Sequence, residues 1–275
     1  MAHKWEAPEN SKAVLVDITK CIGCDACSVA CKMWNDIEFR DVDFNENKSF
    51  HKTEREKIKL DGYNWTSISL HKVEKEDKTV WRYAKHQCLH CDMPACAAAC
   101  FATALKKDPN GPVIFYPNLC VGCRYCFLAC PFDKIKYEWD KSFPFIAKCH
   151  MCPTRIAEGQ APACVSVCPT NVMTFGDKDE MLALARKTIE SDDKYVKHIY
   201  GEKEAGGTSW LYISDVPFEE LGFNTEVKDR PMPEYSYDFQ KYAKYAVVGW
   251  GTMLTAFYLY TKRRNEVAKE EKNKS

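Results

Sequence analysis

The sequence predicts an α+β fold built from two similar modules and followed by one C-terminal transmembrane helix. Three features support this prediction. Sixteen cysteines fall into four groups of four, short apolar runs flank these groups, and one uncharged run lies near the C-terminus. With 275 residues, 45% of them hydrophobic, the chain is long enough to bury a core without disulfide bridges.

The cysteine groups have the spacing of iron–sulfur proteins. In the first and third groups, two, two and three residues separate successive cysteines, whereas the second group has a gap of four and the fourth a gap of eleven. Three cysteines spaced by two residues surround one [4Fe–4S] cube, and in two-cluster ferredoxins the next cysteine binds the neighbouring cluster. The pattern therefore predicts four [4Fe–4S] clusters in two pseudo-symmetric, ferredoxin-like modules. The candidate ligands are Cys21, Cys24, Cys27, Cys31, Cys88, Cys91, Cys96, Cys100, Cys120, Cys123, Cys126, Cys130, Cys149, Cys152, Cys164 and Cys168.

Two other uses of cysteine explain the pattern less well. Disulfide frameworks occur mainly in small secreted domains that lack a sufficient core. Zinc sites usually separate two pairs of cysteines by a longer loop, whereas three closely spaced cysteines would crowd a single tetrahedral ion. Both alternatives stay open on sequence alone, but iron–sulfur ligation accounts for every cysteine.

Short strands are expected beside the cysteine groups. Residues 13–18 alternate in the manner of a strand and lead into the first group, residues 113–116 precede the third group, and residues 172–175 follow the fourth. The first predicted module comprises residues 11–40 and 140–176, and the second comprises residues 80–139.

Two segments without cysteines adjoin the predicted modules. Residues 41–79 are polar and lysine-rich, and we expect a loop with a hairpin there, which is either a partner-contact surface or a solvated one. Residues 177–241 are predicted to pack on the core or on a partner. Within them, Asp177 and Glu180 form a capping-box pattern at the start of a helix. One face of this helix would carry Met181, Leu184, Ala185 and Ile189.

Residues 242–261 are predicted to form the transmembrane helix. The run 245–261 carries no charge and as a helix would be ~26 Å long, slightly less than the hydrocarbon core of a bilayer. Flanking lysines and tyrosines would extend it to the interfaces, and a buried or interfacial helix is the alternative. The tail 262–275 is basic. The positive-inside tendency predicts a cytoplasmic tail, with the cluster modules on the outer (periplasmic) face of the cytoplasmic membrane.

Composition and motifs exclude several function classes. Lys+Arg 39 and Asp+Glu 39 give a formal net charge of zero, which does not favour a nucleic-acid partner. Residues 1–10 lack the pattern of a signal peptide, so we expect export together with a partner that has a twin-arginine leader. No glycine-rich nucleotide-binding motif is present. His86, His90 and His150 are interpreted as neighbours of the clusters or as surface groups rather than ligands. We therefore predict an electron relay without a catalytic residue of its own.

Further motifs accompany the cysteines: Cys21-Ile22-Gly23-Cys24, Trp34-Asn35-Asp36, Cys88-x-His90-Cys91 and Cys130-Pro131-Phe132. With these motifs, nearly the whole chain resembles the iron–sulfur (beta) subunits of membrane-bound respiratory formate dehydrogenases. Those subunits belong to the four-cluster ferredoxin-type family that serves molybdopterin oxidoreductases. The resemblance implies a catalytic molybdopterin (Mo/W) partner that supplies electrons from formate. It also implies a membrane cytochrome b or quinone-reactive subunit that accepts them, with membrane lipid as a further contact.

The resemblance also implies how the ligands pair. The first cluster, nearest the catalytic subunit, would use Cys21, Cys24, Cys27 and Cys168, and the second would use Cys31, Cys149, Cys152 and Cys164. The third would use Cys88, Cys91, Cys96 and Cys130, and the fourth, nearest the membrane, Cys100, Cys120, Cys123 and Cys126. Cys31-Lys32 and Cys100-Phe101 depart from the Cys-Pro ending of ferredoxins, which alters local packing and leaves ligation intact.

A second resemblance competes with the first. The stretch 200–208, Asp215-Val216-Pro217 and Cys123-Arg124-Tyr125-Cys126 are similar to the anchored iron–sulfur subunit of a periplasmic nickel–iron hydrogenase. Another quinone-linked oxidoreductase complex and a stand-alone polyferredoxin are further alternatives.

Overall fold

The computed structural model describes residues 11–39, 60–75 and 78–273. They separate into two compact units, one that ends at Met232 and one that begins at Pro233. The first unit contains all sixteen cysteines. The second consists of the greater part of one long helix.

A three-stranded sheet lies at the centre of the first unit. Its middle strand β1 (Lys12–Asp17) pairs antiparallel with β8 (Met173–Asp177) and parallel with β9 (Trp210–Ile213). The strands predicted at 13–18 and 172–175 are therefore present with shifted ends. Ile18 lies in a 3-10 turn, Ile18–Lys20, because the chain bends there toward the first cysteine.

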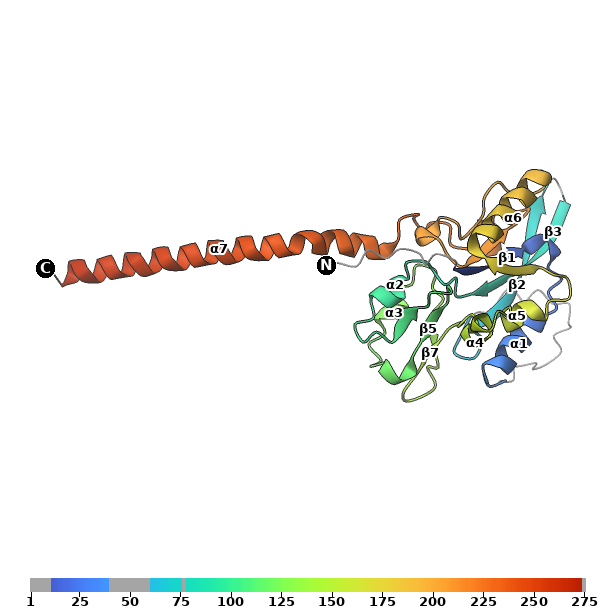
Figure 1. The fold of residues 1–275 in the computed structure, drawn as a ribbon, viewed down its shortest axis with the longest axis horizontal. Helices are drawn as coiled ribbons and strands as arrows, with labels where there is room; N and C mark the ends of the chain where they lie inside the picture. Colours follow the sequence, from blue (N-terminus) through green and yellow to red (C-terminus); the bar gives the residue numbers. More distant parts are fainter. Residues whose placement is uncertain (1–10, 40–59, 76–77, 274–275) are drawn as a thin grey trace. The chain divides into compact units, whose positions relative to one another are not determined.

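Helix α6 (Lys178–Ser191) covers one face of this sheet (Figure 1). Side chains of a strand alternate between its faces, and the set that faces α6 packs on Met181 and Ala185. That set consists of Ala13, Leu15, Leu211 and Ile213. Leu184 was predicted on the packed face, but it is 38% exposed and is not part of the cluster between α6 and the sheet.

The predicted capping box at the start of α6 does not form. Asp177 is the N-cap residue, but its side chain makes no capping hydrogen bond. It accepts a hydrogen bond from Lys12 Nζ at 2.6 Å instead. The carboxylate is thus used to join β8 to β1 at the edge of the sheet.

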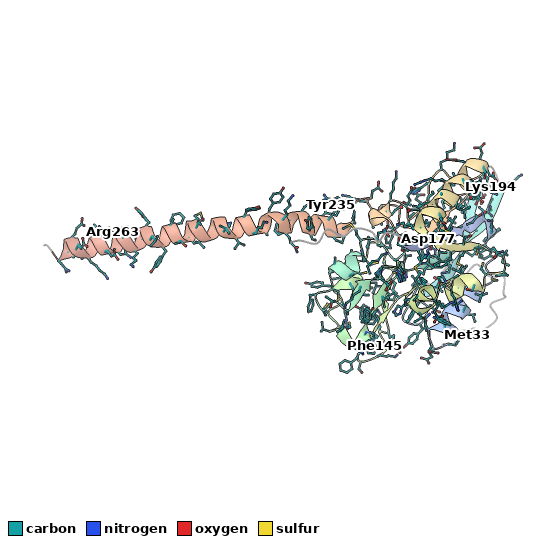
Figure 2. All side chains as sticks on the ribbon, viewed as in Figure 1. Met33, Phe145, Asp177, Lys194, Tyr235 and Arg263 are labelled. Atoms are coloured by element: carbon teal, nitrogen blue, oxygen red, sulfur yellow. The ribbon has the colours of Figure 1, made fainter. Side chains whose placement is uncertain are left out.

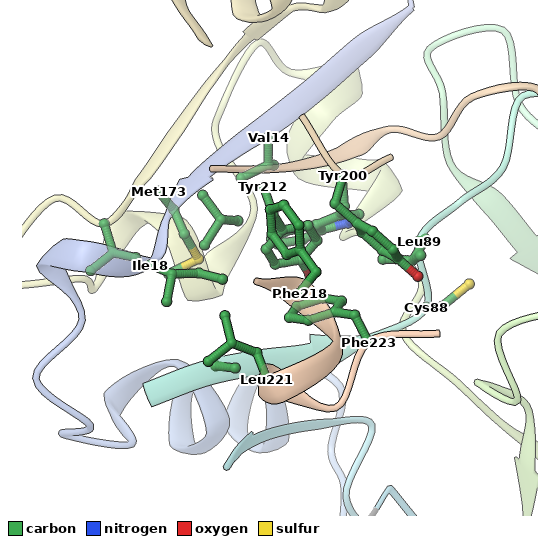
Figure 3. Packing of buried hydrophobic residues seen from close by; sticks show 14 of the residues in the cluster. Val14, Ile18, Cys88, Leu89, Met173, Tyr200, Tyr212, Phe218, Leu221 and Phe223 are labelled. Atoms are coloured by element: carbon green, nitrogen blue, oxygen red, sulfur yellow. The ribbon is translucent and has the colours of Figure 1, made fainter. Parts of the chain in front are cut away.

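An aromatic core fills the opposite face of the sheet (Figure 3). Tyr212 of β9 packs on Phe223 with ring centroids 4.9 Å apart, and Tyr200 packs on the same ring at 4.8 Å. Phe218, in the 3-10 turn Phe218–Leu221, closes this cluster. These residues follow the cysteine groups in the sequence, so the extension predicted at 177–241 supplies much of the core.

A long hairpin leads to the second cysteine group. Strand β2 (Thr66–Lys75) pairs antiparallel with β3 (Lys78–Gln87), with Thr66 opposite Gln87. The hairpin predicted within residues 41–79 is therefore present, but its second strand continues beyond residue 79. Residues 40–59 of that segment lie outside the described residues.

Short helices hold the cysteine groups in two sets (Figure 1). Helix α1 (Ala26–Trp34) packs on α5 (Ala163–Ser166), so the first and fourth groups meet. Helix α4 (Pro153–Ala157) follows the first two cysteines of the fourth group. Helix α2 (Ala95–Ala98) packs on α3 (Tyr125–Ala129), so the second and third groups meet. Two small hairpins accompany the second set: β4 (Leu105–Lys107) with β5 (Val113–Phe115), and β6 (Lys136–Tyr137) with β7 (Ile146–Ala147). The predicted strand 113–116 is β5.

Residues 242–261 lie within the helix α7 (Met232–Lys272), none of whose residues is buried (Figure 2). In the part of the chain that the structure describes, no helix is both long enough and apolar enough to span a bilayer. The transmembrane helix predicted at 242–261 is therefore not confirmed. Polar or weakly apolar residues lower the mean hydropathy of the uncharged run. They are Tyr245, Gly249, Gly251, Thr252, Thr255, Tyr258, Tyr260 and Thr261.

Candidate metal centres

Four cysteines from two distant parts of the sequence line one cavity. Cys21, Cys24 and Cys27 come from the loop and helix after β1, and Cys168 comes from the turn after α5, more than a hundred residues later in the chain. Ile68 of β2 and Met173 of β8 complete the apolar wall. This set is the one that the resemblance implied for the first cluster.

A second cavity is lined by Cys31 of α1 and by Cys149, Cys152 and Cys164. Hydrogen bonds to sulfur are already in place there. The backbone N–H of Met151 donates to Cys149 Sγ at 3.3 Å, and Asn35 Nδ2 lies 3.6 Å from Cys31 Sγ. These four residues are the set implied for the second cluster.

The other eight cysteines form two neighbourhoods around α2 and α3. The pKa of Cys91 is raised well above its usual value, first by burial and then by Cys130, Cys88 and Cys96. The pKa of Cys126 is raised by burial and then by Cys100 and Cys120, against a hydrogen bond from Tyr137 that lowers it. Cys123 is exposed to solvent. The first neighbourhood contains the four residues implied for the third cluster, and the second contains three of the four implied for the fourth.

Burial stabilises the neutral form of two of the thiols. It raises the pKa of Cys27 and of Cys31 to about 12. Metal binding would release their protons, because the thiolate is the ligand. Among residues 11–39, 60–75 and 78–273, no group of three or more His, Cys, Asp or Glu side chains has the geometry to hold a single metal ion.

The first and third cysteine groups share one backbone conformation. Gly23 and Gly122 have φ of +68° and +70°, and the residues two positions later, Asp25 and Arg124, have φ of +57° and +64°. Two left-handed residues in each loop turn the three cysteines toward one side, and a helix begins immediately afterwards in both groups. The glycine is a sequence signal for this turn, but the aspartate and the arginine are not.

A second repeated turn follows three of the groups. The residues three positions after Cys100, Cys130 and Cys168 all have φ near +50°, and each donates its backbone N–H to the carbonyl of that cysteine. One position later, the N–H groups of Ala104 and Lys134 donate to the sulfur atoms of Cys100 and Cys130 at 3.2 and 3.4 Å. Such hydrogen bonds stabilise negative charge on a ligand sulfur.

The histidines are buried to different degrees. His90 is fully buried, and its Nδ1 accepts a hydrogen bond from the backbone N–H of Val113 at 2.8 Å, so its proton resides on Nε2. Burial lowers the pKa of His86 and of His150 to about 3, so both rings are neutral. His150 lines the second cavity. The surface alternative is wrong for His90, and its interpretation as a neighbour of a cluster fits.

Lys85 was missed by the sequence analysis. It is 3% exposed and lines both four-cysteine cavities. It is one of many lysines between residues 48 and 88, and nothing in its local sequence distinguishes it from the solvated ones.

Comparisons with known proteins agree with this geometry. Two models of 4Fe-4S dicluster domains match the chain, one at residues 79–178 and one at residues 20–104. A protein of Nitratidesulfovibrio vulgaris (strain Hildenborough) is 40% identical over 265 residues, which cover 96% of this chain and 70% of that protein. The hydrogenase-2 operon protein HybA of Escherichia coli O157:H7 is 35% identical over 246 residues, with 77% of this chain and 72% of HybA covered. The formate dehydrogenase-O iron-sulfur subunit of Escherichia coli K12 is 36% identical over 226 residues, with 79% and 73% covered.

These matches define a ferredoxin-type iron–sulfur protein with two dicluster domains. The chain belongs to the family of iron–sulfur subunits that includes those of the formate dehydrogenases. It binds [4Fe–4S] clusters, and the residues present fit this group, because two cavities each offer four cysteines, with N–H donors aimed at sulfur.

Proposed function

We propose that this chain is the electron-transfer subunit of a formate dehydrogenase complex. When bound, [4Fe–4S] clusters supply one-electron transfer without bond making. The observation that carries the proposal is the pair of adjoining cavities, which share a lining residue and each present four cysteines. Adjoining sites of this kind suit a relay between two partners.

We also propose the ligand sets and the order of the sites. The cavity of Cys21 and Cys168 would lie toward a catalytic molybdopterin subunit, and the set with the exposed Cys123 would lie toward a membrane cytochrome b or quinone-reactive subunit. Residues 11–40 with 140–176, and residues 80–139, would be the two modules. The packing of α1 on α5 and of α2 on α3 supports this division.

A hydrogenase complex is the second candidate. HybA is 35% identical over 246 residues, about as similar as the formate dehydrogenase subunit over a comparable length. The two candidates differ in the catalytic partner and in the electron donor, so one preparation distinguishes them.

The experiment is anaerobic purification of the tagged full chain from its own cells. Mass spectrometry then identifies the subunits that co-purify, and electron paramagnetic resonance (EPR) follows the clusters after addition of formate or of hydrogen. A molybdopterin subunit and reduction by formate alone would support the proposal. A nickel–iron subunit and reduction by hydrogen alone would replace formate dehydrogenase by hydrogenase. Recovery of a monomer that neither donor reduces would contradict both.

We propose further that the folded unit works at the outer face of the cytoplasmic membrane, held there by its partners. The exposed apolar side chains of α7, including Trp250, Leu254 and Phe257, support a contact with a membrane subunit or lipid. Protease added to intact spheroplasts tests this placement. Digestion of the cysteine-bearing unit supports it, and full protection of that unit contradicts it.

A further inference from the structure

Lys85 stands between the two four-cysteine cavities. It lies on β3, with 3% of its surface exposed. The wall of the cavity with Cys21, Cys24, Cys27 and Cys168 includes Lys85, and so does the wall of the cavity with Cys31, Cys149, Cys152 and Cys164. One cationic side chain is therefore shared by two candidate cluster sites.

The ammonium group is held in one position. Its Nζ donates to Thr66 Oγ1 at 2.7 Å and to Gln87 Oε1 at 2.9 Å, and it lies 4.5 Å from the centroid of the Trp210 ring. Gln87 is itself fixed, because its Nε2 donates to the hydroxyl of Tyr212. Thr66, Gln87 and Tyr212 hold the lysine from three strands, so its position does not depend on a flexible surface loop.

Uncharged groups alone hold this cation. Within the described residues, no carboxylate pairs with Lys85; its partners are a hydroxyl, an amide and an aromatic ring. A buried charge without a counter-ion is costly and is normally paired or neutralised. Asp25 also lines the first of the two cavities. The other anionic groups that line them are the cysteine thiolates, which become anionic when they bind metal.

We propose that Lys85 is a positioning charge shared by the first two cluster sites, which raises the reduction potential of both. One-electron reduction adds one negative charge to a site, and a fixed neighbouring cation favours the reduced state. No bond forms and no proton moves in this step. Because one ammonium lines both sites, it shifts both potentials in the same direction.

The proposal rests on the ligand sets given under the proposed function, but not on which partner supplies the electrons. Its test therefore uses the purified full chain and a chemical reductant. Lys85→Met and Lys85→Gln are compared with wild type by anaerobic dithionite titration followed by EPR. Iron content and the thermal unfolding midpoint are measured on each sample. Lys12→Met is the matched control, because it removes a lysine that pairs with Asp177 at the sheet edge and lines neither cavity.

We expect two of the four clusters to become harder to reduce, by about tenfold in equilibrium constant or roughly 59 mV for one electron. The other two clusters, and all clusters of Lys12→Met, should keep their potentials. Unshifted potentials in fully loaded Lys85 variants would overturn the proposal. A shift in the potential of one cluster alone would overturn the shared role. An equal shift in all four potentials would show that the substitution acts on the whole protein, and would overturn the proposal as well.

A loss of iron from the Lys85 variants also tests the proposal. Lys85→Arg keeps the charge and alters the shape, and Thr66→Val combined with Lys85→Met removes the hydroxyl that would otherwise be left without its donor. If both neutral Lys85 variants lose iron while Lys85→Arg remains loaded and keeps the wild-type potentials, the charge of Lys85 rather than its shape acts on the two sites, which supports the proposal. If Lys85→Arg loses iron as well while the double variant loads with unshifted potentials, the role of Lys85 is packing and the proposal fails.

Discussion

The hydroxyl of Tyr137 lies 3.4 Å from the sulfur of Cys126. Burial, followed by the hydrogen bond to Cys126, raises the pKa of Tyr137, so its hydroxyl stays protonated and donates when the sulfur is a thiolate. Hydrogen bonds to ligand sulfur raise the reduction potential of a cluster. We expect Tyr137→Phe to lower the potential of one cluster, measured by redox titration with EPR, while the iron content stays unchanged.

Tyr195→Phe is the control for this variant. Its hydroxyl donates to Asp17 Oδ2 at 3.0 Å, and its ring packs against α6 rather than beside a cysteine. A shift of the same size in both variants, or no shift in Tyr137→Phe, would show that the contact with Cys126 does not influence the cluster.

Gly23 and Gly122 offer a matched pair of substitutions. Both have φ near +70°, so alanine is strained by roughly 1–2 kcal/mol at either position. A Cβ at Gly23 would clash with the ring of Tyr83, whereas a Cβ at Gly122 would meet nothing within 4 Å. Gly23→Ala should therefore cost about 1–3 kcal/mol more, which corresponds to an unfolding midpoint roughly 2–12 °C lower.

Anaerobic circular dichroism of the two alanine variants gives these midpoints. Iron analysis of the same samples should show less iron in Gly23→Ala than in Gly122→Ala, because displacement of Tyr83 disturbs the loop that carries Cys21 and Cys24. Equal midpoints would mean that the Tyr83 ring moves aside at no cost.

Cys168 belongs to the fourth cysteine group in sequence but lines the cavity of the first group. We expect Cys168→Ser to weaken the cluster held by Cys21, Cys24 and Cys27. Iron should fall from about sixteen atoms per chain toward about twelve. Cys164→Ser, in the other cavity, should lose a different cluster. EPR of the two reduced variants decides between these cases, since loss of the same signal in both would contradict the pairing.

The cysteine groups can be recognised from sequence spacing for a physical reason. A [4Fe–4S] cube constrains the distances between its thiolates, and so it constrains the spacing of its ligands along the chain. The cysteine groups and the strands beside them could therefore be located without coordinates. The αL turns at Asp25 and Arg124 could not, because neither residue type requires a positive φ.

Features that depend on distant residues escaped prediction. Asp177 has the spacing of a cap, but Lys12, 165 residues earlier in the sequence, binds its carboxylate. Lys85 resembles its solvated neighbours in sequence, and only the meeting of β3 with two separate cysteine groups buries it. Local propensity carries no information about such contacts.

The ion pair of Arg82 with Asp215 makes stability depend on pH. Arg82 Nε and Nη2 lie 2.7 and 2.5 Å from the carboxylate oxygens, and Lys75 Nζ lies 3.7 Å away. Burial alone would raise the pKa of Asp215, but the Arg82 hydrogen bonds and the charges of Arg82 and Lys75 outweigh it, and the pKa lies below its usual value. Arg82 of β3 and Lys75 of β2 thus join both strands of the hairpin to the segment after β9.

Because the folded-state pKa of Asp215 is lowered, its contribution to stability is complete above the unfolded pKa of about 3.9 and is lost as the pH falls through the folded value. Asp215→Asn should cost on the order of 2–3 kcal/mol at pH 7, since it leaves a partly buried guanidinium without its anion. The difference in unfolding midpoint from wild type should stay constant between pH 7 and pH 5 and shrink below pH 4. Glu202→Gln, which breaks the exposed pair with Arg186, should change the midpoint little at any pH. A difference for Asp215→Asn that does not shrink in acid would show that its cost comes from packing rather than from the charge.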